Sequence, residues 1–292
     1  MTKKRLLARV SNKVLKPKNA FLLSNSLDII GDIAIIKLPE ELVFKGSEIG
    51  QTILDEAPYI KVVLNQITPV FGEHRIRKFD WLAGEKRTTT IHKEYGCQYQ
   101  VDLKKAYFSP RLSNERMRIA KLVSQEFGEN GKLEVITNLF AGVGCFSILI
   151  AKQSPSRKIY SIDINSNAVN IMERNVLLNK VVGRVIPILG NAREVVNSNL
   201  RSVADRVLMP LPTRAIEFLD TALMCLKTKS GWIHYQDFVH AGSEEDPINE
   251  STKKFIMKMK KFNVDFKIMS SRVVRDVGPH WFHVALDIIV NK

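Results

Sequence analysis

Short segments rich in β-branched residues dominate the first hundred residues of the chain. One helix is expected among them at residues 48–57, and Pro39, Gly72 and Gly84 separate several of the other segments. This pattern predicts a small mixed α/β domain over residues 26–100. The segments expected to be strands are residues 28–38, 60–70, 76–82 and 88–99.

Beyond residue 100, apolar runs of strand length alternate with stretches of helix length. This order predicts a mostly parallel sheet with right-handed helical crossovers over residues 101–292. Only a short turn at residues 275–280 separates the last two strands, which favours an antiparallel edge. The expected strands are residues 134–140, 158–162, 184–189, 206–209, 232–238, 266–274 and 282–290, and the expected helices are 146–152, 165–178, 214–226 and 251–262.

The first 25 residues are basic and show little apolar periodicity, so a short N-terminal segment is expected there. They have no apolar stretch adequate for a secretory signal, and no window of the chain reaches the roughly 18 apolar residues of a membrane span. The three cysteines, Cys97, Cys145 and Cys225, lack zinc-site spacing and indicate buried thiols in a reducing compartment. We therefore expect a cytoplasmic protein with no membrane and no metal among its partners.

The charge balance points to a polyanionic partner. The chain carries 44 Lys and Arg against 30 Asp and Glu, a formal net charge of +14. Such an excess favours nucleic acid, because cations that neutralise phosphates release condensed counterions. A general lysine bias, as in some thermophiles, is the alternative. Many of the cations precede residue 130, whereas those at residues 253–261 fit the solvated face of a helix.

A Gly-x-Gly turn, Gly142-Val143-Gly144, joins an expected strand to an expected helix. Glycines at this place let a ligand approach the backbone and leave helix N-terminal N–H groups facing it. The dinucleotide-binding pattern would continue with Gly or Ala three residues later, where Ser147 stands. A tight turn without a ligand therefore remains an alternative.

The next expected strand ends in Asp163, about 20 residues after the glycines. An acid there can accept hydrogen bonds from both ribose hydroxyls of a nucleoside, so both NAD and S-adenosylmethionine fit. Alone, Asp163 could equally cap the helix that begins near Asn165. Asn191, which follows the third strand, could pair with the adenine amino group or be a plain turn residue.

At this point the chain resembles a known family, the archaeal-eukaryotic tRNA guanine-37 N1-methyltransferases. The resemblance runs from about Asp28 to the C-terminus, and its most specific part is the block Tyr-Phe-Ser-Pro-Arg-Leu-Ser-Asn-Glu-Arg-Met-Arg at residues 107–118. It implies a class I Rossmann-like sheet behind a small N-terminal α/β domain that binds tRNA. The other matching segments are residues 72–75, 91–96, 138–146, 163–165, 207–212, 231–235 and 280–287.

The family transfers a methyl group from S-adenosyl-L-methionine to N1 of the guanosine just 3′ of the anticodon. The resemblance thus implies a tRNA partner, bound at the anticodon stem-loop around position 37, and we expect a monomer. By match, the cofactor site comprises Arg111, Phe140, Gly142, Gly144, Asp163, Ile164, Asn191, Ala192 and Pro210. The substrate-binding residues implied are Tyr107, Phe108, Arg116 and Pro212.

Glu115 matches the family's general base and Arg75 the arginine that binds guanine O6. Neutral guanine carries a proton on N1, so a carboxylate must remove it while a cation stabilises the charge growing on O6. From the residues alone, Glu115 could simply be an acid at a helix start, because Ser113-Asn114-Glu115 has that pattern. Arg75 could simply contact a phosphate.

Two departures from the family pattern are notable. Its usual Asn-Leu-Pro motif after the fourth strand is Pro210-Leu211-Pro212 here, and proline offers neither a side-chain amide nor a backbone donor. This resembles the archaeal branch that also methylates C7 of 4-demethylwyosine, a larger tricyclic base, in wyosine synthesis. We hypothesise both methylations. Asn138, where relatives often have an acid, puts one cofactor contact in doubt.

The second departure is at the N-terminus, where about 25 residues leave little room for the extra domain with which relatives grip the tRNA elbow. We expect a weaker dependence on whole-tRNA shape. The alternatives to the main hypothesis are a Rossmann methyltransferase of another RNA or a small molecule, an NAD-dependent oxidoreductase, and a catalytically silent tRNA-binding module.

Overall fold

The computed structural model describes residues 3–291, except residues 17–18, 20–21, 24–26, 70–71, 73–74, 132, 157 and 228–229. The chain divides into two compact units, Met1–Arg111 and Leu112–Lys292. Residues 101–111, which the sequence pattern assigns to the second domain, thus belong to the first unit. None of the described helices is long and apolar enough to cross a bilayer.

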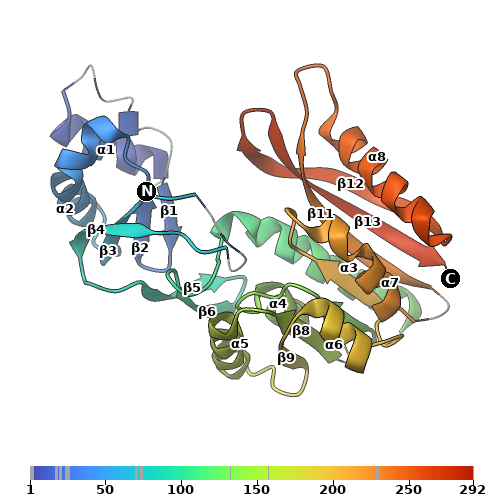
Figure 1. Cartoon of the computed structure of the whole chain (residues 1–292). Helices are drawn as coiled ribbons and strands as arrows, with labels where there is room; N and C mark the ends of the chain where they lie inside the picture. Colours follow the sequence, from blue (N-terminus) through green and yellow to red (C-terminus); the bar gives the residue numbers. More distant parts are fainter. Residues whose placement is uncertain are drawn as a thin grey trace. The chain divides into compact units, whose positions relative to one another are not determined.

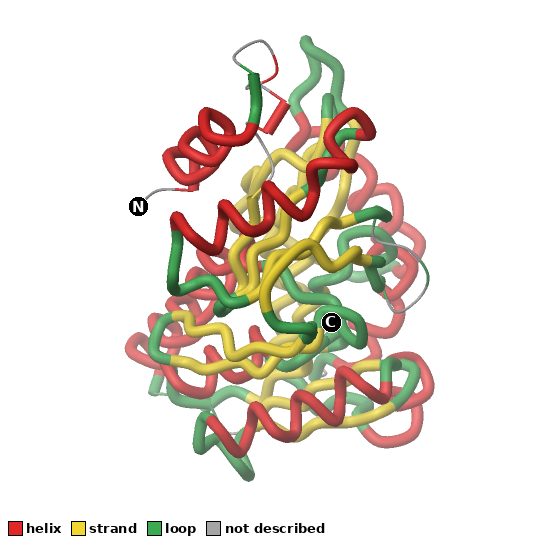
Figure 2. Tube along the Cα trace, turned by 90° about the vertical axis from the view of Figure 1, so that its left-hand side faces the viewer, coloured by secondary structure: helices red, strands yellow, loops and turns green. Residues whose placement is uncertain are grey.

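The first unit contains a four-stranded sheet in the order β1-β2-β3-β4 and a separate β5–β6 hairpin. Strands β2 and β3 are parallel, and the other neighbours are antiparallel. The elements are labelled in Figure 1 and seen from a second side in Figure 2. They are α1 (Lys3–Val14), β1 (Leu27–Ile30), β2 (Ile33–Ile36), η2 (Glu40–Lys45), α2 (Gly46–Glu56), β3 (Val62–Gln66), β4 (Phe79–Gly84), β5 (Thr89–Glu94) and β6 (Cys97–Asp102).

The basic N-terminal segment forms a helix, which its sequence pattern did not predict. Four apolar side chains of α1 lie on one side and are buried in the same core as the inner face of α2. The helix packs against α2, so its basic residues lie on the outer side. The dense basic residues hid the i, i+4 apolar stripe, whose members are Leu6, Leu7, Val10 and Val14.

Two segments expected to be single strands are hairpins. Residues 28–38 turn at Gly31, whose φ is 56°, and a Cβ there would lie 2.1 Å from Thr90 Oγ1. Residues 88–99 turn at Tyr95 and Gly96, which both have positive φ. Only the turn geometry distinguishes a hairpin from one long strand when both arms are β-rich, so the sequence pattern alone was misleading.

The second unit is built on a seven-stranded sheet in the order β12-β13-β11-β10-β7-β8-β9. Strands β7 to β11 are parallel, and β13 and β12 form the antiparallel edge that the sequence predicts. The expected fold class is confirmed. The strands are β7 (Val135–Asn138), β8 (Lys158–Asp163), β9 (Val185–Leu189), β10 (Arg206–Met209), β11 (Ser230–His240), β12 (Asp265–Gly278) and β13 (Trp281–Asn291).

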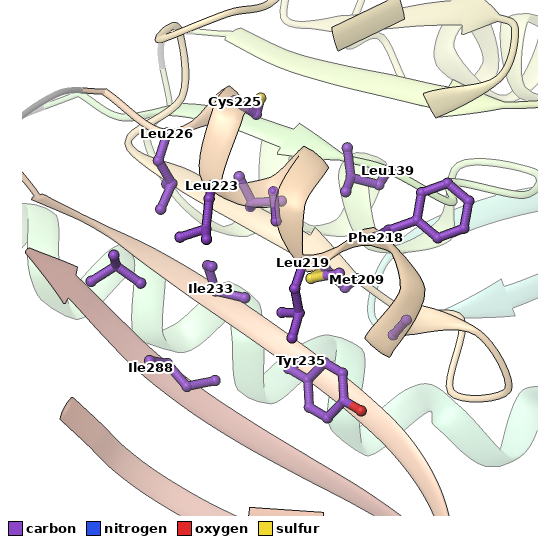
Figure 3. Packing of buried hydrophobic residues seen from close by; sticks show 14 of the residues in the cluster. Leu139, Met209, Phe218, Leu219, Leu223, Cys225, Leu226, Ile233, Tyr235 and Ile288 are labelled. Atoms are coloured by element: carbon purple, nitrogen blue, oxygen red, sulfur yellow. The ribbon is translucent and has the colours of Figure 1, made fainter. Parts of the chain in front are cut away.

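Helices pack on the sheet between successive strands (Figure 1). The last three α-helices share one buried cluster with β10, β11 and β13, and Figure 3 shows its packing around Leu219, Ile233 and Tyr235. The first helix, α3, packs along α4. The helices are α3 (Ser113–Asn130), α4 (Cys145–Gln153), α5 (Ser166–Leu178), α6 (Ala192–Asn199), η4 (Ala215–Phe218), α7 (Leu219–Cys225), α8 (Pro247–Met259) and η5 (Lys260–Phe262).

Candidate active site

The strand order reverses beside β7, because β8 lies on one side of it and β10 on the other. In open α/β sheets, ligands bind at such a switch point, outside the carboxyl ends of the strands. Here the glycine turn follows β7, Asp163 ends β8 and Pro210 follows β10. The turn is fixed to both neighbours, since Leu139 N donates to Leu208 O and Ala141 N donates to Ile162 O. The structure therefore gathers the predicted nucleoside-binding residues of the second unit at one edge.

Both glycines of the turn adopt conformations that L-residues rarely adopt. Gly142 has φ 56° and Gly144 has φ 90°. A Cβ on Gly144 would lie 2.8 Å from Met172 Cγ, closer than packed carbons approach each other. Gly144 is also the residue that precedes α4, so the first N–H groups of that helix begin at the turn. Packing against Met172 and Ile148 thus requires glycine at position 144, and the turn leads into a helix N-terminus, a place where nucleoside phosphates and other anions often bind.

Ser147, which interrupts the dinucleotide pattern, is part of a buried polar cluster beneath the turn. Its hydroxyl accepts from Asn138 Nδ2 at 3.2 Å and from Ser161 Oγ at 2.7 Å. Asn138 Oδ1 in turn accepts from Phe140 N at 3.2 Å. The cluster joins β7, β8 and α4, so Ser147 and Asn138 hold the shape of the turn. Relatives often have an acid at position 138. Here the Asn138 side chain binds Ser147 and the Phe140 backbone within the protein.

Asp163 links the two halves of the predicted cradle. One carboxylate oxygen accepts from Gly142 N at 2.7 Å and the other from Asn165 N at 3.0 Å. The helix cap is Asn165, whose side chain accepts from Asn167 N, so capping does not explain Asp163. Each oxygen of a carboxylate can accept more than one hydrogen bond, so an acid at this position suits recognition of ribose hydroxyls. The neighbouring Ile164 is 39% exposed and presents an apolar surface beside the acid.

Asn191 caps α6, because its side-chain oxygen accepts from Arg193 N at 2.9 Å. A local role for Asn191, rather than a contact with adenine, is the alternative that the sequence left open. Ala192 is buried and begins the helix. Phe140 lies edge-to-face with Phe218 at 5.0 Å between ring centroids. Pro210 is half-buried and Pro212 buried, and Phe238 N donates to Pro212 O. The positions after β10 thus present proline rings rather than amides.

Glu115 lies in the first turn of α3, as its sequence context predicts, and only 4% of its side chain is exposed. Arg118, one turn later, grips both of its oxygens at 2.9 and 2.6 Å. The same guanidinium grips both oxygens of Asp287 on β13, at 2.6 and 3.1 Å. Burial opposes the charge of Arg118, but these two carboxylates outweigh it and raise its pKa. Arg116, predicted to bind substrate, is buried and 3% exposed.

Asp287 extends the buried chain of polar groups. Arg206 donates to His234 Nε2 at 2.6 Å, so that nitrogen must accept and Nδ1 donates to Asp287 at 2.5 Å. Burial lowers the pKa of His234 and keeps it neutral. Burial would raise the pKa of Asp287, but the bonds from His234 and Arg118 outweigh it and hold that pKa below its usual range. The chain of groups ends where Glu134 receives two bonds from Arg206.

In the first unit, the structure brings Arg75 and Tyr107 together. The Arg75 guanidinium lies 4.8 Å from the Tyr107 ring centroid, with that of Arg77 at 5.7 Å. Arg75 has φ 54°, an uncommon backbone conformation for a long side chain, and its N–H donates to Gly72 O in a turn. Phe108 is buried and packs on His92. Arg111, expected at the cofactor, pairs with Asp28 at 2.9 Å.

The His234–Asp287–Arg118 connection is the part of the site that sequence reasoning missed. Arg118 and Asp287 are 169 positions apart. Residues 231–235 and 280–287 both match the family pattern, but only the pairing of β11 with β13 places His234 opposite Asp287.

The fold and the glycine–aspartate turn define a Rossmann-like domain, and the family comparison identifies it as a methyltransferase domain. Residues 90–287 match the family described as "TRM5/TYW2 methyltransferase domain", and residues 7–88 match "TYW2 N-terminal domain". The chain belongs to the TRM5/TYW2 family.

Similar proteins include a Pyrococcus abyssi tRNA (guanine(37)-N(1))-methyltransferase, Trm5b, which is 40% identical over 92% of this chain and 76% of its own. The crystal structure of Trm5b from that organism has a TM-score of 0.83, with 100% of this chain and 82% of that chain covered at 37% identity. The Saccharolobus solfataricus tRNA 4-demethylwyosine(37)-methyltransferase Taw21 is 38% identical over 91% of this chain and 94% of its own.

Proposed function

We propose that this chain transfers the methyl group of S-adenosylmethionine to the purine at position 37 of tRNA, at N1 of guanosine. The observation that carries the proposal is a buried carboxylate, Glu115, on a helix that packs along the helix of the glycine turn. The likeness to two position-37 methyltransferases supports the substrate. A further similar structure, 35% identical with a TM-score of 0.81, is a complex of aTrm5 with tRNALeu.

Residues at the switch point fit the cofactor. Gly142 and Gly144 provide the positive φ angles of the turn, and backbone N–H groups of Gly142 and Asn165 hold the two oxygens of Asp163 at the end of β8. Phe140, Ile164, Asn191, Ala192 and Pro210 complete the proposed site. When bound, S-adenosylmethionine supplies a methyl group made electrophilic by its sulfonium. Relatives have been solved in complex with adenosine, AdoMet and MeSAdo.

Glu115 removes the N1 proton of the target guanine. Transfer would break the bond between the methyl group and the sulfonium sulfur, leaving a neutral thioether, and would form the bond from N1 to the methyl carbon. The N1–H bond would break in the same reaction, and Glu115 would take up its proton. Arg118 remains paired with Asp287 while Glu115 turns toward the base, so the guanidinium is not left as an unpaired buried charge. The proposed role of Arg75 is to bind O6, where negative charge grows. Tyr107 beneath its guanidinium orients it.

Pro210-Leu211-Pro212 supports a second methylation, at C7 of 4-demethylwyosine. Two prolines and a leucine form an apolar wall without an amide side chain. Such a wall suits a flat tricyclic base better than it suits a guanine whose amide edge must be hydrogen-bonded. Taw21, named as a 4-demethylwyosine methyltransferase, is nearly as similar to this chain as Trm5b. A Methanocaldococcus jannaschii aminocarboxypropyltransferase named for the same base is 33% identical.

The deciding assay incubates the full chain with S-adenosylmethionine and two tRNAs, one with guanosine at position 37 and one with 4-demethylwyosine. Mass analysis of the position-37 nucleoside then identifies the product. We expect the mass of each base to increase by 14 units, because a methyl group replaces a hydrogen atom. Labelling of guanosine tRNA alone would exclude the second methylation. An aminocarboxypropyl product on the 4-demethylwyosine tRNA would show that the second reaction is not a methylation. No product on either tRNA would exclude the whole proposal.

The net charge of +14 supports tRNA as partner, and monomeric, cytoplasmic action belongs to the same proposal. A catalytically silent tRNA-binding module is the competing hypothesis. Calorimetric titration with S-adenosylmethionine separates the two, because a silent module has no need to bind the cofactor.

A further inference from the structure

A groove in the first unit, lined by an exposed tryptophan and cationic side chains, lies outside every residue assigned above. Its volume is about 410 Å³, within the range of about 300–1,000 Å³ that small-ligand pockets occupy. Strand β4 forms one wall and the segment after it the other. The lining residues are Leu64, Phe79, Trp81, Lys86, Arg87, Thr88 and Lys104.

Trp81 lies at a position where nearly half of the residue stays exposed, so its burial contributes little to the stability of the fold. It pairs with Leu64 across the β3–β4 ladder, at a bulge between Val63 and Leu64. The next residue, Leu82, points the other way into the core beneath α2, whereas the Trp81 side of β4 leaves the residue 45% exposed. An exposed tryptophan ring in a groove offers a face on which a flat ligand can stack.

The cations around Trp81 fall into two kinds. Arg87 is committed, because it binds both oxygens of Asp32 and also Glu85. Lys86 and Lys104 are exposed, and no acidic side chain in the described part of the chain pairs with either ammonium group. Lys86 Nζ lies 5.2 Å from the Trp81 ring centroid, the arrangement of a cation on an aromatic face.

We propose that this groove binds an unpaired nucleotide of the RNA substrate, with the base stacked on Trp81 and its phosphates on Lys86 and Lys104. An aromatic face beside uncommitted cations is how proteins hold single-stranded nucleic acid. Neither lysine has an acidic partner within the described residues, so both ammonium groups are available for phosphates. This arrangement favours a nucleic acid over a protein as the occupant. The proposal rests on RNA being the substrate, and it adds a contact made by residues of the first unit that the proposed methyl transfer does not use.

Trp81→Ala and Trp81→Phe in the full chain test the stacking. Without added cofactor, we expect tRNA to bind Trp81→Ala about tenfold more weakly than the wild type, the loss of one stacked base. Trp81→Phe, which keeps an aromatic ring, recovers most of the affinity. The matched control is Phe44→Ala, at an 81% exposed aromatic outside the groove, which leaves affinity unchanged.

Fluorescence distinguishes stacking on Trp81 from a purely structural role of this residue. Stacking on a base quenches tryptophan emission, so tRNA quenches the wild type more than Trp81→Phe. Inorganic polyphosphate, which carries charge without bases, binds without that difference. Lys86→Gln and Lys104→Gln each lower the slope of log affinity against log salt by somewhat less than one unit.

The outcomes separate this inference from the proposed function. Wild-type protein that methylates tRNA, together with Trp81→Ala that binds it equally tightly, overturns the stacking site alone. Equal quenching of the wild type and Trp81→Phe also overturns it. Failure of the wild-type protein to bind tRNA at all overturns both proposals.

Discussion

Glu115 and Asp287 share one guanidinium, and this arrangement decides how a buried carboxylate can act as a base. Arg118 binds both oxygens of each acid, so it holds two negative charges against the cost of burial. If Glu115 moves toward a substrate, Asp287 still neutralises Arg118. In the proposed reaction the cation therefore stays paired, and the proposed part of Asp287 is to position Arg118.

Replacing the base alone tests its role. Glu115→Gln keeps the size of the side chain but cannot accept a proton, so we expect the rate of methyl transfer to fall by about 10²–10⁴-fold. Binding of S-adenosylmethionine, measured by calorimetry, stays within about twofold. The matched control is Glu129→Gln, an exposed acid on the same helix, with unchanged rate. A Glu115→Gln enzyme of normal rate would remove Glu115 from the mechanism.

Asp287→Asn tests the shared guanidinium through stability. The folded-state pKa of Asp287 lies below its ordinary value of 3.8, so its charge stabilises the fold above about pH 4 and that contribution is lost as the pH falls. Removing one partner of a buried ion pair costs about 3–5 kcal/mol. We expect this loss in urea unfolding at pH 7 and a smaller difference from the wild type below pH 4. A constant difference at all pH values would contradict the pairing.

At the scale of elements, α1 is the clearest case of tertiary packing that sequence pattern failed to reveal. Leu6 is 1% exposed and Val10 fully buried. We expect Leu6→Ala to lower the free energy of unfolding by about 2–5 kcal/mol, the usual cost of a buried leucine truncated to alanine. Lys4→Ala, an exposed position of the same helix, serves as the control and changes stability little. Equal stability of the two variants would show that α1 does not belong to the core.

The sequence predicted those elements whose boundaries are set by local chemistry. Strand β10 occupies the expected residues, and α5 begins at Ser166, one residue after the expected start, with Asn165 rather than Asp163 as its cap. Helix α6 was missed because its eight residues have only two buried side chains, Ala192 and Val196. Short amphipathic helices of this kind are fixed by packing on the sheet, which no local pattern records.

The candidate site divides in the same way. The glycine turn and Asp163 are consecutive in the chain's βαβ pattern, so their spacing alone made them candidates. In the sequence pattern Ser147 is a break in a motif, whereas the structure makes it the centre of a polar cluster with Asn138 and Ser161. Its partners lie on two other elements, and only the parallel pairing of β7 with β8 brings them together.

At the scale of the whole molecule, the net charge of +14 predicts how binding depends on salt. Each phosphate contact releases counterions, so log affinity for tRNA falls linearly with log salt concentration, with a slope of about −0.7 to −0.9 per contact. S-adenosylmethionine is small and bound at a preformed cradle, so its affinity changes little over the same range. We therefore expect raising the salt from about 50 to about 200 mM to raise KM for tRNA by at least roughly tenfold while KM for the methyl donor stays nearly constant. Steady-state kinetics across a series of salt concentrations measures both values in one experiment. A tRNA KM that is as insensitive to salt as the donor KM would show that the cations of this chain do not serve RNA binding, and would favour a small-molecule substrate.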